Sequence, residues 1–430
     1  MLKRITLILL ALAFSLSAVA QDASDLERRL RALEEKIASM QPSQDLTEIR
    51  RQIEILGKEI ESLKTQQTDT AVAADTETFG LGAAASKVYR SQPGVSFGGY
   101  GELIYQNIDG RVDTADALRA ILYTGYKFND RVVFNSEVEY EHANTERNGE
   151  VEVEFAYLDY LFKPSFNLRA GLMLMPVGIT NEQHEPTAFL ASRRTQVESR
   201  VIPTTWSEIG VGAFGDVGTL SYRAYVTTAL SSTGITATGI RGGRQMGSQA
   251  KADDLAFVGR LDWHPVEGAI VGGSVYTGNS GQDAKFGGRV SLVEVHGDAK
   301  FRGVSLRALA ARGTIDDVTA INAANNLRGN ASVGEDFGGW YVEGGYDVAP
   351  LFIKRGEMSL TPFVRYEAWD TQREVPAGFL RNPANDQNIL TIGFNFKPIP
   401  QTVIKVDWQD VDNEANTGLD QWNIALGYIF

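Results

Sequence analysis

The chain has 430 residues, with 43 Gly, 20 Phe, 15 Tyr and no Cys, and its formal net charge is -13. This acidic balance argues against nucleic-acid binding, because phosphate contacts require clustered Lys and Arg. A chain without cysteine is not a disulfide-stapled domain, and the composition fits an oxidising compartment in which free thiols are a hazard. The mean hydropathy of -0.18 still permits a transmembrane barrel, since only alternate residues of each strand face lipid.

The first twenty residues (1–20) have the pattern of a secretory signal peptide. Lys3 and Arg4 precede an apolar run over 5–14, and Ala18-Val19-Ala20 supplies the small residues of a cleavage site. We therefore expect cleavage after Ala20 and export of the remainder. No later stretch approaches the roughly 18 uninterrupted apolar residues of a membrane helix, so insertion into a membrane would require a barrel. The alternative is a soluble periplasmic β-protein.

Residues 22–66 repeat apolar side chains with the four-three spacing of a coiled coil. The seam contains Leu26, Leu30, Leu33, Ile37 and Met40, followed by Ile49, Ile53, Leu56, Ile60 and Leu63. Pro42 and a change of phase divide it into two pieces, each of which is marginal as an isolated helix. We predict a periplasmic coiled coil, with a plain surface helix as the alternative, and then a linker over 67–94 that is rich in Thr, Ala, Asp and Gly.

Residues 95–430 are predicted to form an all-β, sixteen-stranded antiparallel transmembrane barrel. The strands are expected near 95–108, 117–128, 131–144, 150–162, 166–175, 207–216, 219–230, 255–264, 268–278, 286–301, 303–313, 337–348, 357–370, 387–398, 401–412 and 419–430. Tight turns such as 129–130 and 302–303 alternate with long connections, of which 176–206 is the longest. With both termini in the periplasm, the long loops lie outside, as in outer-membrane barrels.

Alternation along each strand assigns its two faces. The predicted lipid face contains Val132, Phe134, Val138 and Tyr140 on one strand and Val151, Val153 and Phe155 on the next. The predicted lumen face contains Glu137, Glu139, Glu152 and Glu154. A charge on the lipid face costs about 2–4 kcal/mol near the membrane midplane, so this register is strongly favoured. Sixteen strands enclose an aqueous channel rather than a core filled with side chains.

The last strand ends at the chain terminus with an aromatic residue. Trp422, Ile424, Leu426, Tyr428 and Phe430 share one face of this strand. Such a strand resembles the closing strand of bacterial outer-membrane barrels. The resemblance implies that Trp422, Tyr428 and Phe430 are part of a signal read by the barrel assembly machinery, and that the barrel contacts outer-membrane lipid and lipopolysaccharide.

The long connection 176–206 is the main functional candidate, because loops of this length are usually functional or disordered. It contains three prolines and the charged residues Glu182, Glu185, Arg193, Arg194, Glu198 and Arg200. We expect it to fold into the pore as the third outer loop and to bring its arginines opposite Glu137, Glu139, Glu152 and Glu154. The result would be a narrow, polarised constriction. The alternatives are a solvated cap and a contact between subunits.

No catalytic residue, cofactor or metal is expected. The letters of 210–215 match GxGxxG, but this stretch has the pattern of a strand and not of a glycine turn that opens a helix, so we expect no dinucleotide site. None of the four histidines belongs to an HExxH motif, and the chain has no GxSxG elbow. His184 lies near Glu182 and Glu185, a group that could bind a divalent ion or act as a base. Single charged residues in loops are most often solvated, so we expect neither role.

Three segments resemble the central strands and loop of bacterial porins of the phosphate-selective porin O and P group. They are 134–141 (FNSEVEYE), 168–178 (LRAGLMLMPVG) and 201–212 (VIPTTWSEIGVG). The coiled coil is similar to that of dicarboxylate-channel porins. The resemblance implies a homotrimer of sixteen-stranded barrels with a passive channel through each. It does not imply phosphate as the solute, because inward positions mix Arg119, Arg131, Arg169, Arg223, Arg260 and Lys405 with as many acids.

The sequence therefore predicts a porin of the outer membrane of a Gram-negative bacterium, through which small hydrophilic and charged solutes diffuse passively. The predicted function involves no enzymatic step. The alternative is a structural anchor, in which the barrel holds a coiled coil that contacts the cell wall or another envelope protein.

Overall fold

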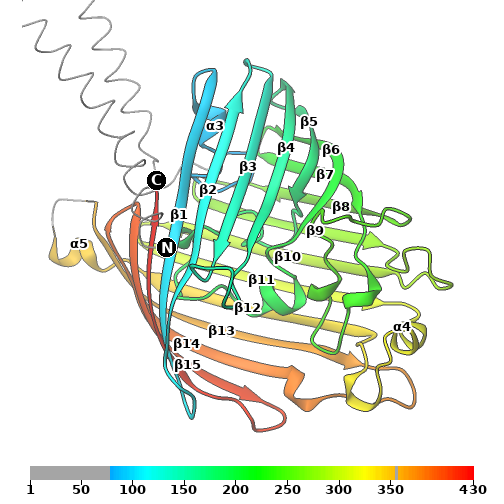
Figure 1. Cartoon of the computed structure of the whole chain (residues 1–430). Coiled ribbons are helices and arrows are strands. Elements are labelled where there is room, and N and C mark those ends of the chain that lie inside the picture. The colour runs from blue at the N-terminus through cyan, green and yellow to red at the C-terminus, as the bar shows by residue number, and fades with distance from the viewer. Residues whose placement is uncertain (1–77, 354–356) are drawn as a thin grey trace, which may run out of the picture. The chain divides into compact units, whose positions relative to one another are not determined.

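The computed structural model describes residues 78–353 and 357–430. Sixteen antiparallel strands pair in sequence order, and β1 (Gly94–Ile108) pairs with β16 (Gln421–Ile429) to close a barrel (Figure 1). The predicted antiparallel barrel and its number of strands are confirmed. The predicted signal peptide (1–20) and coiled coil (22–66) lie outside the described residues.

The strands between β1 and β16 are β2 (Thr114–Lys127), β3 (Val132–Glu141), β4 (Val151–Lys163), β5 (Phe166–Leu174), β6 (Ser207–Val217), β7 (Leu220–Thr228), β8 (Leu255–Trp263), β9 (Ala269–Gly278), β10 (Val290–Phe301), β11 (Val304–Ile315), β12 (Asp336–Tyr346), β13 (Ser359–Glu374), β14 (Asp386–Ile399) and β15 (Thr402–Asn413). Short helical turns lie between strands or before β1: α3 (Lys87–Arg90), α4 (Val318–Ala324), α5 (Ala349–Phe352), η1 (Pro186–Ala188), η2 (Val197–Val201), η3 (Ser232–Gly234), η4 (Arg241–Gly243), η5 (Gly329–Ala331) and η6 (Pro383–Asn385). No helix in the described part of the chain is both long and apolar enough to cross a membrane.

The two ends of the barrel differ in the length of their connections. One end has tight turns such as 164–165, 218–219 and 302–303, and β1 begins and β16 ends there. The other end has the long connections, including 175–206, 229–254 and 316–335. This is the predicted asymmetry. The GxGxxG letters at 210–215 lie within β6, so they belong to a strand as expected.

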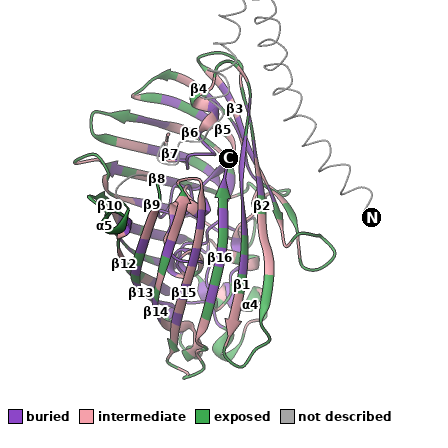
Figure 2. Ribbon diagram, turned by 90° about the vertical axis from the view of Figure 1, so that its left-hand side faces the viewer, coloured by how far each residue is buried: buried purple, intermediate pink, exposed green. Residues whose placement is uncertain are grey.

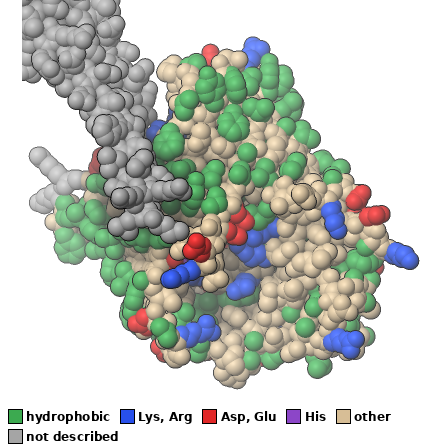
Figure 3. All heavy atoms as spheres, viewed as in Figure 1, with side chains coloured by type: hydrophobic (Ala, Val, Ile, Leu, Met, Phe, Trp, Pro, Cys, Tyr) green, Lys and Arg blue, Asp and Glu red, His purple; other side chains and the backbone are tan. Residues whose placement is uncertain are grey.

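Outward and inward side chains alternate along the strands, as Figure 2 shows by the alternation of exposed and buried residues. On β16, Trp422 and Ile424 are exposed, whereas Asn423 between them is fully buried. Figure 3 shows hydrophobic side chains gathered over the outer surface of the strands. This apolar outer face is what contact with lipid requires, because hydrocarbon offers no partner to a polar group.

Phe155 does not face outward, so its predicted placement is wrong. The β3–β4 register shifts between Glu137, which lies opposite Phe155, and Val138, which lies opposite Val153. Glu154 is the extra residue of this β-bulge, and both Glu154 and Phe155 are fully buried. After the bulge the inward and outward positions are exchanged, so Phe155 faces inward. The centroid of its ring lies 5.3 Å from that of the buried Tyr157, and the two rings stack.

Residues 78–92, here called the inner segment, pack against lumen-facing side chains of the barrel wall. The hydroxyl of Tyr89 donates a hydrogen bond to Asp159 of β4 at 2.6 Å. The amide of Asn135 on β3 donates to the Ala85 carbonyl at 2.8 Å. Leu81 and Val88 are buried. The last part of the predicted linker 67–94 therefore lies inside the barrel, against β3 and β4.

Candidate functional site

The connection Met175–Trp206, here called the inner loop, crosses the lumen and contacts strands on several sides of the barrel. It meets side chains of β3, β7, β12, β13 and β15 through the pairs His184–Glu137, Glu182–Arg223, Glu198–Tyr341, Gln196–Glu367 and Ser192–Asp407. A cap across the mouth would contact strands only near their ends, whereas these five wall residues lie in the interior of their strands, so the loop lies within the lumen.

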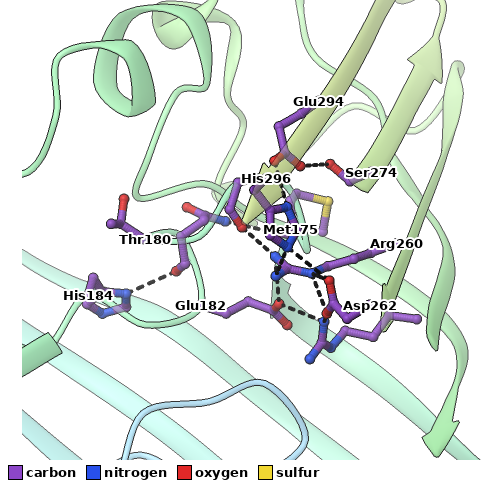
Figure 4. Close-up of polar contacts among 12 residues, drawn as sticks. Met175, Thr180, Glu182, His184, Arg260, Asp262, Ser274, Glu294 and His296 are labelled. Carbon is purple, nitrogen blue, oxygen red and sulfur yellow. Dashed lines mark hydrogen bonds and ion pairs between the residues drawn. The ribbon is translucent and has the colours of Figure 1, made fainter. Parts of the chain in front are cut away.

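Glu182 attaches the first part of the inner loop to the wall. Its carboxylate lies 3.4 Å from Arg223 of β7 and 3.8 Å from Arg260 of β8. Asp262 binds the same two arginines, at 3.1 and 2.8 Å, and lies 3.0 Å from Nε2 of His296 (Figure 4). Because these charges are balanced within the network, Glu182 is an anchor for the loop and not an open charge in the lumen.

Glu185 joins the inner loop to the inner segment. Its Oε1 accepts hydrogen bonds from the backbone amides of Ala84 and Ala85 at 2.9 and 3.0 Å. Gly82 permits this approach, since a Cβ there would lie 2.5 Å from the same oxygen. The two elements that occupy the lumen are therefore attached to each other as well as to the wall.

Glu198 holds the far end of the inner loop. Its side chain is fully buried. Oε2 accepts hydrogen bonds from the backbone amide and hydroxyl of Thr180 at 2.6 and 2.9 Å, and Oε1 accepts one from the Tyr341 hydroxyl at 2.7 Å. Both carboxylate oxygens have partners, so a buried charge is supported by three hydrogen bonds.

The substitution Tyr341→Phe is expected to lower the free energy of unfolding of the purified barrel by about 1–3 kcal/mol, because it leaves Oε1 of Glu198 buried without a donor. Urea unfolding followed by tryptophan fluorescence measures this change. Tyr105→Phe is the matched control, since Tyr105 also donates to a carboxylate, that of Asp113, but at an exposed site. Equal stability losses in the two variants would contradict an anchoring role for Glu198.

His184 lies between two lumen-facing carboxylates. Its Nε2 is 3.1 Å from Oε1 of Glu137 and 3.1 Å from Oε2 of Glu154. All three side chains are buried. Burial favours the neutral imidazole, but the two carboxylates outweigh it and raise the pKa of His184 to about 10. Glu139 lies on the same wall, 3.6 Å from Arg119, while Glu152 remains partly exposed.

Arg193, Arg194 and Arg200 line a pocket of about 290 Å³ with Arg119 and Arg241. Its acids are Glu102 and Glu141 rather than the four predicted glutamates. Within the described residues, none of the three loop arginines nor Arg241 has a carboxylate within 4.0 Å. Arg193 donates to the Gln106 amide oxygen at 2.8 Å instead.

The positive charges in this pocket crowd one another. Burial and the guanidinium groups of Arg244, Arg194 and Arg200 lower the pKa of Arg241 to about 10. Arg241 and Arg244 donate to the backbone carbonyls of Thr204 and Thr205 and so attach the connection 229–254 to the inner loop. Backbone carbonyls do not neutralise a guanidinium, so the pocket keeps an excess of positive charge.

A second pocket, of about 370 Å³, lies on the tight-turn side of the inner loop. It is lined by Lys300, Arg302, Arg307 and Lys397 together with Asp298, Glu343 and Asp347. Phe189 lines both pockets, so they adjoin at this side chain. The Phe189 ring also lies 3.5 Å from Nζ of Lys405. The face of the barrel seen in Figure 3 is hollowed, and charged side chains lie within this hollow.

Sequence reasoning missed Arg241 and Arg244. They belong to the connection 229–254, which follows the inner loop at the same end of the barrel. Neighbouring loops of a barrel lie side by side, so the short RGGR run at 241–244 was the available signal. It also missed the inner segment, because a stretch rich in Gly and Ala has the composition of a linker.

No family model matches the chain. The closed barrel is similar to those of outer-membrane proteins of known structure. The loop L8 deletion mutant of OmpT, an outer membrane protein of Vibrio cholerae, is 11% identical with a TM-score of 0.52, over 78% of this chain and 99% of that one. Salmonella typhi OmpF, in complex with daunomycin, is 12% identical with a TM-score of 0.50, over 78% of this chain and 97% of that one. At such low identity, these likenesses establish the barrel fold alone.

A protein of Aquifex aeolicus (strain VF5), described only as an uncharacterized protein, is 37% identical to this chain over 365 residues. The match covers 82% of this chain and 83% of the relative. The chain belongs to the same family as that protein.

Proposed function

We propose that this protein is a porin of the bacterial outer membrane, a passive channel for small hydrophilic solutes in which the inner loop forms the constriction. The carrying observation is that the inner loop contacts β3, β7, β12, β13 and β15. A loop held on several sides restricts the cross-section of an otherwise wide barrel. The apolar outer face and the asymmetry of the two ends support location in the outer membrane.

Small anions are the solutes that the lining favours. One pocket is lined by four arginines, each of which has no carboxylate within 4.0 Å among the described residues: Arg193, Arg194, Arg200 and Arg241. Fixed charges inside a narrow passage with low-dielectric walls raise the local concentration of ions of opposite sign. The proposal extends to anions as a class; phosphate selectivity, as in the porin O and P group, is not part of it.

Swelling of proteoliposomes tests the channel. Liposomes that contain the purified protein should swell in isotonic solutions of small sugars, and the rate should fall steeply as the sugar grows, because the inner loop limits the passage. Liposomes prepared with the same protein after boiling provide the control. A swelling rate equal to that of this control for every sugar would contradict the proposed function and favour the structural anchor.

The predicted coiled coil (22–66) is proposed to support a homotrimer, since three short seams can bury one another where a single one is marginal. Replacement of a seam residue, Ile53→Asn, is expected to lower the temperature at which the oligomer dissociates on electrophoresis. Glu54→Asn, one position further and outside the seam, is the matched control. If deletion of 22–66 leaves the oligomeric state and its heat resistance unchanged, the heptads serve another envelope partner.

A further inference from the structure

One buried cluster joins the inner loop to the wall through groups that bind metal ions in proteins. It consists of His184 from the loop, Glu137 from β3 and Glu154 from the bulge of β4. One potential ligand atom from each lies within 4.8 Å of the other two, and no other described residues form such a group of three. The side chains of His184, Glu137 and Glu154 are 1%, 0% and 0% exposed.

The hydrogen bonds of His184 orient its second nitrogen for a ligand. Nδ1 lies 3.0 Å from the carbonyl oxygen of Asn181, which can only accept, so Nδ1 carries a proton. A metal-binding histidine commonly donates its other ring N–H to a backbone carbonyl in this way. Nε2 lies 3.1 Å from a carboxylate oxygen on either side. Tetrahedral ligands with bonds of about 2.1 Å are about 3.4 Å apart, which is close to both N–O distances, and the two carboxylate oxygens lie within 4.8 Å of each other.

A second observation also indicates a ligand here. Oε2 of Glu137 and the hydroxyl of Tyr100 are buried and have no hydrogen-bond partner among the described residues, whereas Oε2 of Glu154 faces Nε2 of His184 at 3.1 Å. The Tyr100 ring lies 6.1 Å from the His184 ring. Buried polar atoms are almost always paired, and a cluster of unpaired ones calls for a bound ion or water. Arg119 pairs with Glu102 and Glu139, and no guanidinium of the described residues lies within 4.0 Å of Glu137 or Glu154.

We propose that Glu137, Glu154 and His184 bind one divalent transition-metal ion, with Zn²⁺ and Mn²⁺ as the chemical class, and that this ion fixes the inner loop to β3 and β4. Imidazole suits Zn²⁺ and carboxylates suit both Zn²⁺ and Mn²⁺, whereas Ca²⁺ prefers six to eight oxygen ligands. The site differs from the His184, Glu182 and Glu185 group that is adjacent in sequence, since Glu182 and Glu185 bind other partners. It does not depend on the channel function.

Metal content of the full-length protein tests the site. The protein, purified in detergent and stripped with EDTA, is dialysed against Zn²⁺ or Mn²⁺, and the retained metal is measured by mass spectrometry. We expect one ion per chain, and an affinity at least about tenfold lower for Glu154→Gln and His184→Gln. His296→Gln is the matched control, because His296 also lies between two carboxylates, Asp262 and Glu294, yet forms no such cluster. This control should keep the ion.

X-ray absorption at the zinc edge of the loaded wild-type protein decides the question even if a variant fails to fold. We expect one imidazole and carboxylate oxygens at about 2.0–2.2 Å. Spectra without imidazole, or a wild-type protein that retains no metal after dialysis, would overturn the proposal. The cluster would then be held by a proton on Nε2 of His184.

Discussion

Replacing Arg193, Arg194 and Arg200 together by glutamine is expected to shift the permeability of the channel from anions towards cations. These side chains line the pocket beside the inner loop, where Glu102 and Glu141 would then lack much of the opposing charge. Electrostatic focusing in such a passage changes local ion concentrations about tenfold or more, so we expect roughly a tenfold fall in the anion-to-cation permeability ratio. Reversal potentials across a salt gradient measure this ratio, and the shift should shrink in high salt.

A control with the same change in net charge separates this local effect from the overall charge of the protein. Arg111, Arg147 and Arg328 are exposed residues of three other connections. Their replacement by glutamine should leave the reversal potential close to that of the parent protein. If the pocket variant and the control behave alike at low salt, the arginines of the inner loop do not line the path of the ions.

Removal of Phe430 is expected to leave most of the chain unassembled in the cell. Its backbone completes the ladder that closes the barrel: the amide of Gly99 donates to the Phe430 carbonyl at 3.0 Å, and the amide of Phe430 donates to Gly99 at 2.9 Å. Its ring lies 6.1 Å from that of Phe97. The terminal strand also resembles the signal read by the assembly machinery, so the loss should affect assembly more than the stability of barrels already formed.

The fraction of heat-modifiable barrel in outer-membrane preparations measures assembly, and refolding of the same chain in detergent measures intrinsic stability. Phe301→Ala is the matched control, because Phe301 is also an exposed aromatic residue at the end of a strand but is far from the terminus. Equal amounts of assembled barrel from the parent and from the chain without Phe430 would contradict a role in assembly.

Period-two alternation was sufficient to predict sixteen strands and the outward face of β16, because the lipid face of a barrel admits few polar residues. It failed at Phe155, since a bulge adds one residue without changing the composition of the strand. No local sequence pattern predicts such a bulge. The predicted end of the closing strand, with Trp422, Tyr428 and Phe430 exposed, agrees with the structure.

The length of the connection 176–206 indicated its importance, but its charges could not be assigned to roles. Glu182, Glu185 and Glu198 bind Arg223, the inner segment and Tyr341, partners that are distant in sequence and become neighbours only when the barrel closes. Because these carboxylates bind other partners, they do not neutralise the arginines of the same loop. The tertiary structure therefore decides that the acids of this loop anchor it and that its arginines line the pocket.

Single-channel recording in planar lipid bilayers tests the central proposal most directly, namely that the barrel is an open channel narrowed by the inner loop. Purified full-length protein should insert in discrete steps of conductance, each step should be stable in time, and the reversal potential in a salt gradient should have the sign of an anion-preferring pore. Incorporated barrel that gives no current above that of the bare bilayer would contradict the proposed function.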